Sequence, residues 1–431
     1  MADYLVALRG PGRTDQRRNN RVSSSGIIEA TTTTESRTRH VTGRSESMFA
    51  ADLAAHDAEL RAAIDGASVL VIGGAGTIGS SFIRALLPYR PARLVVVDLS
   101  ENGLTELTRD LRSTHEQYVP AKYLTYPISF GDAVFERMLR HEGPFDIVAH
   151  FAAHKHVRSE KDRYSIEAMV ENNVLSTARL LDLLTDAPPR HFFCVSTDKA
   201  ANPANVMGAS KKLMEEAVLA YASELPATTA RFANVAFSNG SLPAGFLERI
   251  TKGQPLSSPS DVRRYFVSPA ESGQLCLAAC ILGSPGDILF PRLESPTMLT
   301  FSSIADALLA ELGYTPDHCS SEDEARAKAA ARHPDDTTWP VYYFESDTSG
   351  EKSFEEFHTE DEDVDLERFS ALGVVHGRAT YDVPGIRALG SSLRDLFAQP
   401  DLPKDAIVTE LTRLVPSFHH VETGKSLDQK M

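Results

Sequence analysis

A glycine-rich turn between an apolar strand and a helix constrains this chain most strongly. The run Ser68–Gly73 is short and apolar, which is typical of a buried parallel strand, and a helix is predicted over Ile78–Leu87. Between them, Gly73, Gly76 and Gly79 have the spacing G-x-x-G-x-x-G. Glycine permits backbone angles that other residues resist, and it lets a pyrophosphate approach the main chain. The segment therefore predicts a dinucleotide-binding turn.

The next apolar run supports the same interpretation. Arg93–Asp98 reads as a second buried strand and ends in an acid about 20 residues after Gly79. A carboxylate at Asp98 suits the ribose hydroxyls of an adenosine and repels a 2′-phosphate, so NAD is expected, with NADP as the alternative. Thr77 and Ile78 open the helix, whose N-terminal N–H groups would face the anion. The alternative is a glycine turn with no ligand.

Strand and helix patterns then alternate along the chain. This alternation predicts an α/β fold of Rossmann type, with a doubly wound parallel sheet. A helical pattern over Met48–Ile64 precedes the first strand. The later strands are predicted at Phe145–His150, His191–Ser196 and Thr228–Phe232, and the helices at Ala133–Leu139, Ile166–Leu184 and Ser210–Glu224.

Composition along the chain suggests four parts. Residues 1–48 are rich in Ser, Thr and Arg and poor in apolar residues, so we expect a mobile arm. Residues 49–235 form the NAD(P)-binding domain with the catalytic segment. Residues 236–415 form mainly a smaller substrate domain, and most carboxylates of its acidic stretch at 317–365 are expected to lie on a solvated face. Residues 416–431 are expected to be a disordered tail.

Charge and cysteine usage exclude several classes of protein. The formal net charge of -15 argues against a nucleic-acid partner, because binding to phosphates needs a basic surface. The absence of a long apolar run or a secretory signal predicts no membrane span and a cytoplasmic location. The four cysteines are too few for a disulfide framework. Cys276 and Cys280 are expected to be buried thiols, and no metal site is predicted.

Reactive side chains follow one of the predicted strands directly. His191–Val195 leads into Ser196–Lys199, and Asn205–Lys211 comes soon after. Ligands of open α/β sheets bind at the carboxyl ends of the strands, so this cluster of hydroxyl, carboxylate and amine is placed for chemistry. Met207 and Lys211 are four residues apart and share one helix face.

These motifs together resemble the extended short-chain dehydrogenase/reductase superfamily. More narrowly, the chain resembles the bacterial polysaccharide-biosynthesis group that includes UDP-N-acetylglucosamine 4,6-dehydratases. The resemblance extends over about residues 68–357. The matching stretches are Gly73–Gly79, His150–Val157, Asn173-Val174, Ser196–Lys199, Asn205–Lys211, Arg231–Val235, Arg264–Phe266 and Gly350–Glu356.

The resemblance implies a reaction. A UDP-N-acetylhexosamine would become its 4-keto-6-deoxy product through hydride transfer to and from a nicotinamide that stays tightly bound and is recycled. Lys199 matches the base for the carbon 5 proton, and Asp198 matches the acid that protonates the departing 6-hydroxyl. Thr197 matches the hydroxyl that contacts the 4-oxygen, and Lys211 matches the lysine that holds the nicotinamide ribose.

The resemblance also implies binding positions. Arg264 matches a cation on the pyrophosphate, for which a bidentate guanidinium is suited. Each binding role has an alternative. Asn173 could have a purely structural role, and Arg264 could form a surface salt bridge. Glu355 and Glu356 could lie on a solvated helix face. Ala152 falls at a cofactor position, and the substrate positions are Lys155, Asn173, Asn234, Arg264 and Glu356.

Two positions depart from the superfamily pattern. Met207 stands where the superfamily usually has tyrosine, and a thioether cannot exchange the 4-hydroxyl proton. A subset of membrane-anchored dehydratases in the resembled group also shows methionine, so the departure does not imply an inactive enzyme. Thr197 with a bound water, or Lys199, could carry that proton. Pro127–Ser129 lacks the Asp that often meets the adenine amino group in this group.

Two other functions remain open. One is a nucleotide-sugar epimerase acting at carbon 4 or 5, and the other is an inert nucleotide-binding scaffold. The Asp198–Lys199 pair favours a 4,6-dehydratase over an epimerase, because simple 4-epimerisation needs no acid at carbon 6. The expected partners are a nucleotide sugar, UDP-linked by resemblance, and a second copy of the chain in a homo-oligomer.

Overall fold

A computed structural model describes residues 38, 39, 41–156, 160–293, 297–346 and 355–420. Most of the predicted N-terminal arm and the last part of the predicted tail lie outside these residues. The description that follows concerns the compact unit that begins at Thr38.

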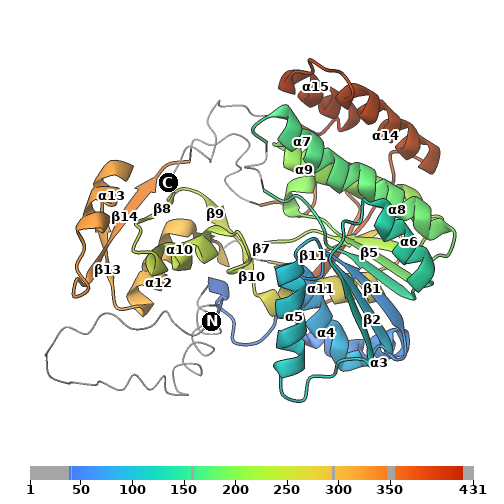
Figure 1. Cartoon of the computed structure of the whole chain (residues 1–431), viewed down its shortest axis with the longest axis horizontal. Helices are drawn as coiled ribbons and strands as arrows, with labels where there is room; N and C mark the ends of the chain where they lie inside the picture. Colours follow the sequence, from blue (N-terminus) through green and yellow to red (C-terminus); the bar gives the residue numbers. More distant parts are fainter. Residues whose placement is uncertain (1–37, 40, 157–159, 294–296, 347–354, 421–431) are drawn as a thin grey trace, which may run out of the picture. The chain divides into compact units, whose positions relative to one another are not determined.

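A nine-stranded sheet forms the centre of this unit (Figure 1). Its strand order is β15-β16-β11-β6-β5-β4-β1-β2-β3, and only β16 runs against the others. The order reverses between β1 and β4, which makes their carboxyl ends the ligand crevice of a doubly wound sheet. The strands are β1 (Ser68–Ile72), β2 (Arg93–Val97), β3 (Lys122–Tyr126), β4 (Ile147–His150), β5 (His191–Val195), β6 (Ala227–Ala230), β11 (Asp287–Pro291), β15 (Val364–Asp365) and β16 (Leu372–His376).

Helices cover both faces of this sheet. Side chains alternate along β1, so Val69 and Val71 pack on one face while Leu70 and Ile72 pack on the other. Burial on both faces explains why the strands read as continuous apolar runs. The first face carries α4 (Thr77–Leu86), α5 (Glu101–Ser113) and α11 (Pro269–Leu282), and the second carries α6 (Ala133–Glu142), α8 (Ser176–Thr185) and α9 (Val206–Tyr221).

The predicted elements agree with this arrangement, with shifts at their ends. The helix predicted from Ser210 begins at Val206, because the Asn205 side chain caps it by accepting from the Gly208 N–H. The long helical pattern over Ile166–Leu184 contains a π-helical turn, η3 (Glu171–Leu175), between α7 (Arg163–Val170) and α8. The predicted N-terminal helix is split into α2 (Ala50–Ala55) and α3 (Asp57–Ile64).

A smaller lobe is built from residues after Val235. A three-stranded sheet in the order β13-β14-β8 packs against helices around Phe246, Leu308, Trp339 and Val341. Its elements are α10 (Leu242–Thr251), β8 (Leu256–Pro259), α12 (Phe301–Glu311), β13 (Thr315–His318), α13 (Glu322–Ala331) and β14 (Thr338–Phe344). There are also two short strand pairs, β7 (Asn234–Val235) with β10 (Phe266–Val267) and β9 (Arg263–Arg264) with β12 (Leu299–Thr300).

Several elements of residues 236–415, which were predicted to form mainly a smaller substrate domain, belong to the main sheet or pack on its helices. Strands β11 and β16 belong to the main sheet, and α11 lies on its face, because their side chains are apolar and need that core. Helices α14 (Val383–Phe397) and α15 (Lys404–Leu414) pack over α7 and α9 (Figure 1). The chain therefore leaves the Rossmann domain and returns to it.

The ends of the packed chain also differ from the prediction. The mobile arm expected from the sequence includes Arg44, yet its guanidinium holds the Glu271 carboxylate at 2.7 Å, and Val41 is buried. The expected disordered tail includes Phe418, but this side chain is buried, and His420 Nε2 lies 2.6 Å from a Glu160 oxygen. Specific polar and apolar contacts therefore hold residues 41–48 and 416–420 against the packed unit.

Hydropathy gives one further finding about the helices. In the part of the chain that the structure describes, no helix has the length and apolar character needed to cross a bilayer.

Candidate active site

The turn between β1 and α4 has the geometry of an anion cradle. Gly73 has φ +78°, and a Cβ there would lie 2.4 Å from the Ala152 backbone nitrogen. A Cβ on Gly79 would lie 2.3 Å from the Gly73 carbonyl oxygen, so the helix can pack this closely only without a side chain. At Gly76 the nearest atom is 3.5 Å away, which leaves an open approach to the N-terminus of α4. These residues fit a pyrophosphate against the main chain.

Asp98 lies directly beside this cradle. Its Oδ2 accepts from the Ala75 N–H at 3.0 Å, and its Oδ1 accepts from the Ser100 N–H at 2.9 Å. The half-buried carboxylate therefore stands at the end of β2, where an adenosine ribose would lie in a dinucleotide complex. Thr77 and Ile78 form the first turn of α4, and Thr77 Oγ1 accepts from the Asn239 N–H at 3.0 Å. The cradle and the acid together fit an NAD-like group.

The turn after β5 brings three reactive side chains together. Asp198 is buried in η4 (Asp198–Ala200), and its Oδ1 accepts from the Thr197 hydroxyl at 2.7 Å. Lys199 Nζ lies 3.1 Å from each Asp198 oxygen and is partly exposed. Thr197 caps the turn, since its side chain accepts from the Lys199 N–H. The hydroxyl, carboxylate and amine thus form one contiguous group.

The first turns of α9 lie beside this group. Lys211 is buried and donates to the Val195 carbonyl oxygen at 2.9 Å, at the end of β5. Burial lowers the pKa of Lys211 below its ordinary value. Met207 is also buried and packs in an apolar cluster with side chains of α7 and α14, including Met169 and Leu393. The thioether therefore occupies an apolar site at the position where the superfamily usually places a tyrosine.

Asn173 holds the loop after β4 against α9. Its Oδ1 accepts from the His154 N–H at 2.8 Å, and its Nδ2 donates to the His154 oxygen at 2.9 Å and to Ser210 Oγ at 3.0 Å. These contacts give the buried amide a positioning role. Lys155, in the same loop, is exposed and donates to the Asn239 oxygen at 3.0 Å.

His150, at the end of β4, is a buried titratable group that the sequence did not single out. Its Nε2 lies 3.3 Å from Thr177 Oγ1, while its Nδ1 has no hydrogen-bond partner among the described residues. Burial and the nearby Lys211 lower the pKa of His150 to about 3, so the imidazole is neutral at physiological pH.

The substrate positions predicted beyond β6 converge on one buried acid. Glu355 Oε2 accepts from the Tyr265 N–H at 2.9 Å, Oε1 contacts the Asn234 side-chain amide, and Arg264 Nε lies 3.9 Å from Oε1. Burial, followed by the charge of Asp198, raises the pKa of Glu355 to about 8. The solvated helix face considered for Glu355 is therefore wrong, because the carboxyl is enclosed.

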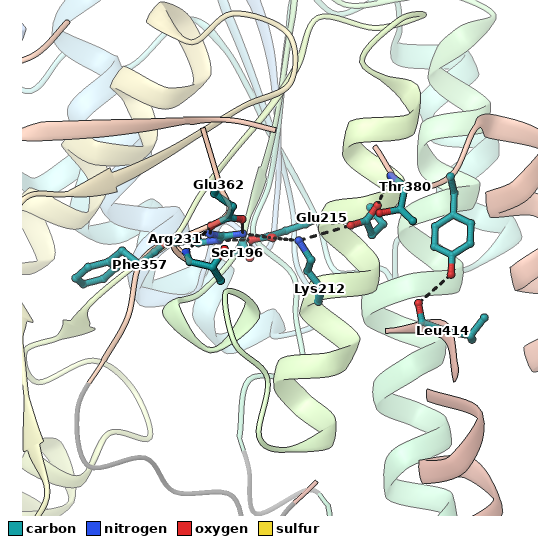
Figure 2. Close-up of polar contacts among 11 residues, drawn as sticks. Ser196, Lys212, Glu215, Arg231, Phe357, Glu362, Thr380 and Leu414 are labelled. Carbon is teal, nitrogen blue, oxygen red and sulfur yellow. Dashed lines mark hydrogen bonds and ion pairs between the residues drawn. The ribbon is translucent and has the colours of Figure 1, made fainter. Parts of the chain in front are cut away.

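A buried charge network connects Ser196–Lys199, the turn after β5 that is the candidate catalytic turn, to the segment that carries Glu355 (Figure 2). Ser196 Oγ donates to Glu215 at 2.7 Å, and Arg231 binds the same carboxylate through two contacts of 2.9 and 2.8 Å. On its other side, Arg231 binds both oxygens of Glu362 at 2.8 Å and the Phe357 carbonyl oxygen at 2.9 Å. Arg231 and Glu215 are fully buried, so this network is shielded from solvent. The solvated face predicted for the acidic stretch fails at Glu362 as well.

The match to known families covers this whole region. A family model described as polysaccharide biosynthesis protein matches residues 69–376. The chain belongs to this polysaccharide biosynthesis protein family. The matched range includes the glycine turn, the catalytic turn, the Arg231 network and the main sheet from Val69 of β1 to His376 of β16.

Two relatives illustrate the range of this family. The chain is 30% identical over 316 residues to the uncharacterized membrane protein MJ1061 of Methanocaldococcus jannaschii, and the match covers 72% of this chain and 85% of that protein. A UDP-N-acetylglucosamine 4,6-dehydratase (inverting) of Campylobacter jejuni is 25% identical, over 58% of this chain and 73% of its own length.

The solved structures confirm the fold of this family member. DesIV, a dTDP-glucose 4,6-dehydratase from Streptomyces venezuelae solved with NAD and TYD bound, has a TM-score of 0.52 at 20% identity. The match covers 76% of this chain and 97% of that one. The Rossmann-type α/β fold predicted from the sequence is therefore confirmed.

The thiols of this family member are structural. All four cysteines are free and buried, as predicted for Cys276 and Cys280, and burial raises the pKa of Cys194 to about 12. A thiol that holds its proton so firmly is a poor metal ligand. Across the described ranges, no group of three or more His, Cys, Asp or Glu side chains could hold a metal ion.

Proposed function

We propose that this chain is a nucleotide-sugar 4,6-dehydratase that works with a bound NAD. The observation that carries the proposal is the contiguous Thr197–Asp198–Lys199 group at the end of β5, on the same edge of the sheet as the cradle between β1 and α4. Elimination of water from carbons 5 and 6 needs a base and an acid held within reach of one hexose, and this turn supplies both kinds of group.

The cofactor would be held by the cradle after β1 and by Lys211 of α9. Gly73, Gly76 and Gly79 accommodate the pyrophosphate, and Asp98 favours NAD over NADP because a carboxylate repels a 2′-phosphate. Bound there, NAD would supply a reversible acceptor for the hydrogen of carbon 4. Lys211 is close enough to the end of β5 to bind the nicotinamide ribose after exchanging its contact with the Val195 oxygen.

The substrate we propose is a UDP-N-acetylhexosamine. Arg264 and Asn234 both lie against Glu355, and a guanidinium suits a diphosphate. Lys155, which donates to the Asn239 oxygen, and Glu356, which accepts from Asn202 Nδ2 at 3.3 Å, are the further substrate residues that we propose. The activity of the Campylobacter jejuni relative supports this substrate class.

The chain's own residues then perform the proton transfers. Thr197 would contact the 4-oxygen, and its hydroxyl already donates to Asp198, which gives the 4-hydroxyl proton a route that avoids Met207. A ketone at carbon 4 acidifies the carbon 5 proton, which Lys199 would remove as the base. The Asp198–Lys199 pair thereby supplies the acid and the base for elimination of water from carbons 5 and 6. In a 4-epimerase, an acid at carbon 6 would have no role.

A mass assay tests the proposal. The protein is incubated with UDP-N-acetylglucosamine and NAD, and the expected product is lighter than the substrate by one water. Asp198→Asn and Lys199→Ala should each abolish that loss. A sugar of unchanged mass with inverted configuration at carbon 4 or 5 would favour an epimerase. Cofactor binding with no turnover of any nucleotide sugar would favour an inert scaffold.

A further inference from the structure

The segment that carries Glu355 and Glu356 is connected to the turn after β5 in two places. At Asp198 the connection is indirect, because the Asp198 N–H donates to the Phe232 oxygen at 3.4 Å, and Asn234, two residues after Phe232, contacts Glu355. After the acid–base pair, Asn202 Nδ2 donates to Glu356. The fold therefore places a second carboxyl, that of Glu355, within electrostatic reach of Asp198, from a part of the sequence more than 100 residues away.

The two buried carboxyls have opposite surroundings. Asp198 accepts on both oxygens, from the Thr197 hydroxyl and the Lys199 amine, so its carboxylate is surrounded by donors. Glu355 is enclosed, and burial and the Asp198 charge outweigh Lys199 and Arg264, so its raised pKa keeps it protonated at neutral pH. A protonated Glu355 can still be satisfied, because the Asn234 amide can turn its oxygen toward the acid.

The two carboxyls therefore lie in contrasting environments, since Asp198 accepts from an amine and a hydroxyl while Glu355 is enclosed, and such a contrast divides acid and base roles between neighbouring groups. We propose that Glu355 is a catalytic residue that donates the proton with which the 6-hydroxyl leaves as water, while Asp198 accepts the 4-hydroxyl proton through Thr197. This inference rests on the proposed function and changes one role, because the family resemblance gives the donor role to Asp198.

The protons balance over one turnover when the partly exposed Lys199, which donates to Asp198 in the resting site, first releases one proton to solvent, acts as a free amine, and regains that proton from solvent at the end. The 4-hydroxyl proton moves through Thr197 to Asp198. Lys199 takes the carbon 5 proton, the bond between carbon 6 and oxygen breaks, and the oxygen leaves as water with the proton of Glu355. Lys199 returns its proton to carbon 5 when the hydrogen taken from carbon 4 is delivered to carbon 6. Transfer of the remaining proton from Asp198 to Glu355 restores the starting state, so the two carboxyls act as a coupled pair.

The Arg231 network fixes Glu355 in this position. Arg231 holds the Phe357 oxygen and Glu362 on one side, and through Glu215 and Ser196 it holds the start of the catalytic turn on the other (Figure 2). Both halves of the proposed acid–base site are therefore anchored to one buried guanidinium, which suits a proton donor that must keep its place relative to Lys199.

Matched variants separate this inference from its alternatives. Glu355→Gln keeps the shape and removes the proton, Asp198→Asn tests the acceptor, and Glu360→Gln is an exposed control in the same segment. Each is given UDP-N-acetylglucosamine in deuterated water, and separately a 6-deoxy-6-chloro analogue, whose leaving group needs no proton.

The inference predicts a distinct pattern for each variant. Glu355→Gln should lose product formation by about 100-fold or more, yet its recovered substrate should carry solvent deuterium at carbon 5, and the chloro analogue should restore turnover. Asp198→Asn should lose deuterium uptake as well, with no rescue by the analogue. Glu360→Gln should behave as the unaltered protein does. The inference is overturned if Asp198→Asn is the rescued variant, or if Glu355→Gln retains full activity or loses deuterium uptake.

A titration of the ligand-free protein gives a readout independent of turnover. With glutamate labelled by carbon-13 at the carboxyl, one resonance that disappears in Glu355→Gln should titrate near the pKa of about 8. An ordinary acidic titration of that resonance would overturn the inference while leaving the dehydratase intact. If the unaltered protein releases no water from any nucleotide sugar, the proposed function fails, and with it the role of Glu355, even when the resonance titrates as expected.

Discussion

The three motif glycines of the turn after β1 differ in what a methyl group would meet. At Gly79 it would collide with the Gly73 carbonyl oxygen at 2.3 Å, whereas at Gly76 the nearest atom is 3.5 Å away. Gly79→Ala should therefore destabilise the fold by roughly 1–3 kcal/mol through overpacking. Gly76→Ala should leave the unfolding midpoint nearly unchanged and weaken NAD binding, because its methyl group enters the space for the pyrophosphate.

Thermal unfolding and a binding titration with NAD check this pair together. Equal loss of stability in both variants would show that the turn is only structural. Unchanged NAD affinity in Gly76→Ala would show that the pyrophosphate does not approach the turn at that residue.

The Glu215 carboxylate should make stability depend on pH in the acidic range. Burial acts to raise its pKa, but the Arg231 guanidinium dominates and holds the pKa below its ordinary value. A carboxylate with a depressed pKa in the folded state stabilises the protein above the pKa of the unfolded chain, and the stabilisation fades as pH falls through the lower folded value. Glu215→Gln should cost roughly 3 kcal/mol at pH 7, the low end for a broken buried pair because Glu362 still holds Arg231.

Urea unfolding at pH 7 and below pH 4 measures this effect. The difference between the unaltered protein and Glu215→Gln should shrink at the lower pH, while the exposed control Glu224→Gln should stay near zero at both. A difference that is independent of pH would mean that the charge of Glu215 does not carry the stabilisation.

At the residue scale, the sequence predicted the groups that are adjacent along the chain and missed those that the fold brings together. Thr197, Asp198 and Lys199 follow one apolar strand, so their proximity could be read directly. The burial of Glu355 could not, because its partners Tyr265 and Asn234 lie 90 and 121 residues away in sequence. The Arg231 network was hidden for the same reason.

Element by element, the strength of the apolar pattern decided what could be predicted. Strands β1, β2 and β5 are apolar and buried on both faces, and all three were predicted. Strand β3 at the sheet edge is only half-buried and carries polar residues, so its pattern is weak and it was missed. The return of β11 and β16 to the main sheet depends on contacts between distant segments that no local pattern reveals.

Helices α14 and α15 cover the helix that carries Lys211. Leu393 of α14 is fully buried and belongs to the same apolar cluster as Met207 and Leu213 of α9. Leu393→Ala should therefore cost about 2–5 kcal/mol, through lost burial and the cavity that it leaves. Leu366→Ala is the matched control, because that leucine is 45% exposed and its truncation should cost under about 0.5 kcal/mol.

Denaturant unfolding of the two leucine variants measures these costs, and catalytic assays follow the effect on the site. Equal costs would contradict the view that α14 is part of the core beneath α9. Because Met207 shares the cluster, we also expect Leu393→Ala to lower turnover more than Leu366→Ala does.

For the whole molecule, the reversal of strand order between β1 and β4 explains why one edge of the sheet gathers the site. The cradle, Asp98, His150 and the catalytic turn all follow the carboxyl ends of parallel strands. The sequence predicted this arrangement because repeated strand–helix alternation permits few topologies. The assembly of the chain into a homo-oligomer stays a prediction.

Cofactor binding should be visible as a change in the stability of the whole molecule. A ligand that binds only the folded state at a hundredfold excess over its Kd stabilises it by about 2.7 kcal/mol. NAD should raise the unfolding midpoint more than NADP at equal concentration, because Asp98 repels a 2′-phosphate. Asp98→Asn keeps an acceptor for the Ala75 N–H and should reduce the difference between the midpoint shifts that NAD and NADP produce. An equal response to both cofactors in the unaltered protein would contradict the role given to Asp98.

The most direct test of the central claim follows one hydrogen atom through the reaction. UDP-N-acetylglucosamine labelled with deuterium at carbon 4 is incubated with the protein and NAD, and the label is located by NMR. A dehydratase that recycles its bound cofactor should deliver the label to carbon 6 of a 4-keto-6-deoxy product. A label that returns to carbon 4 of an epimerised sugar, or a substrate recovered unchanged, would contradict the account.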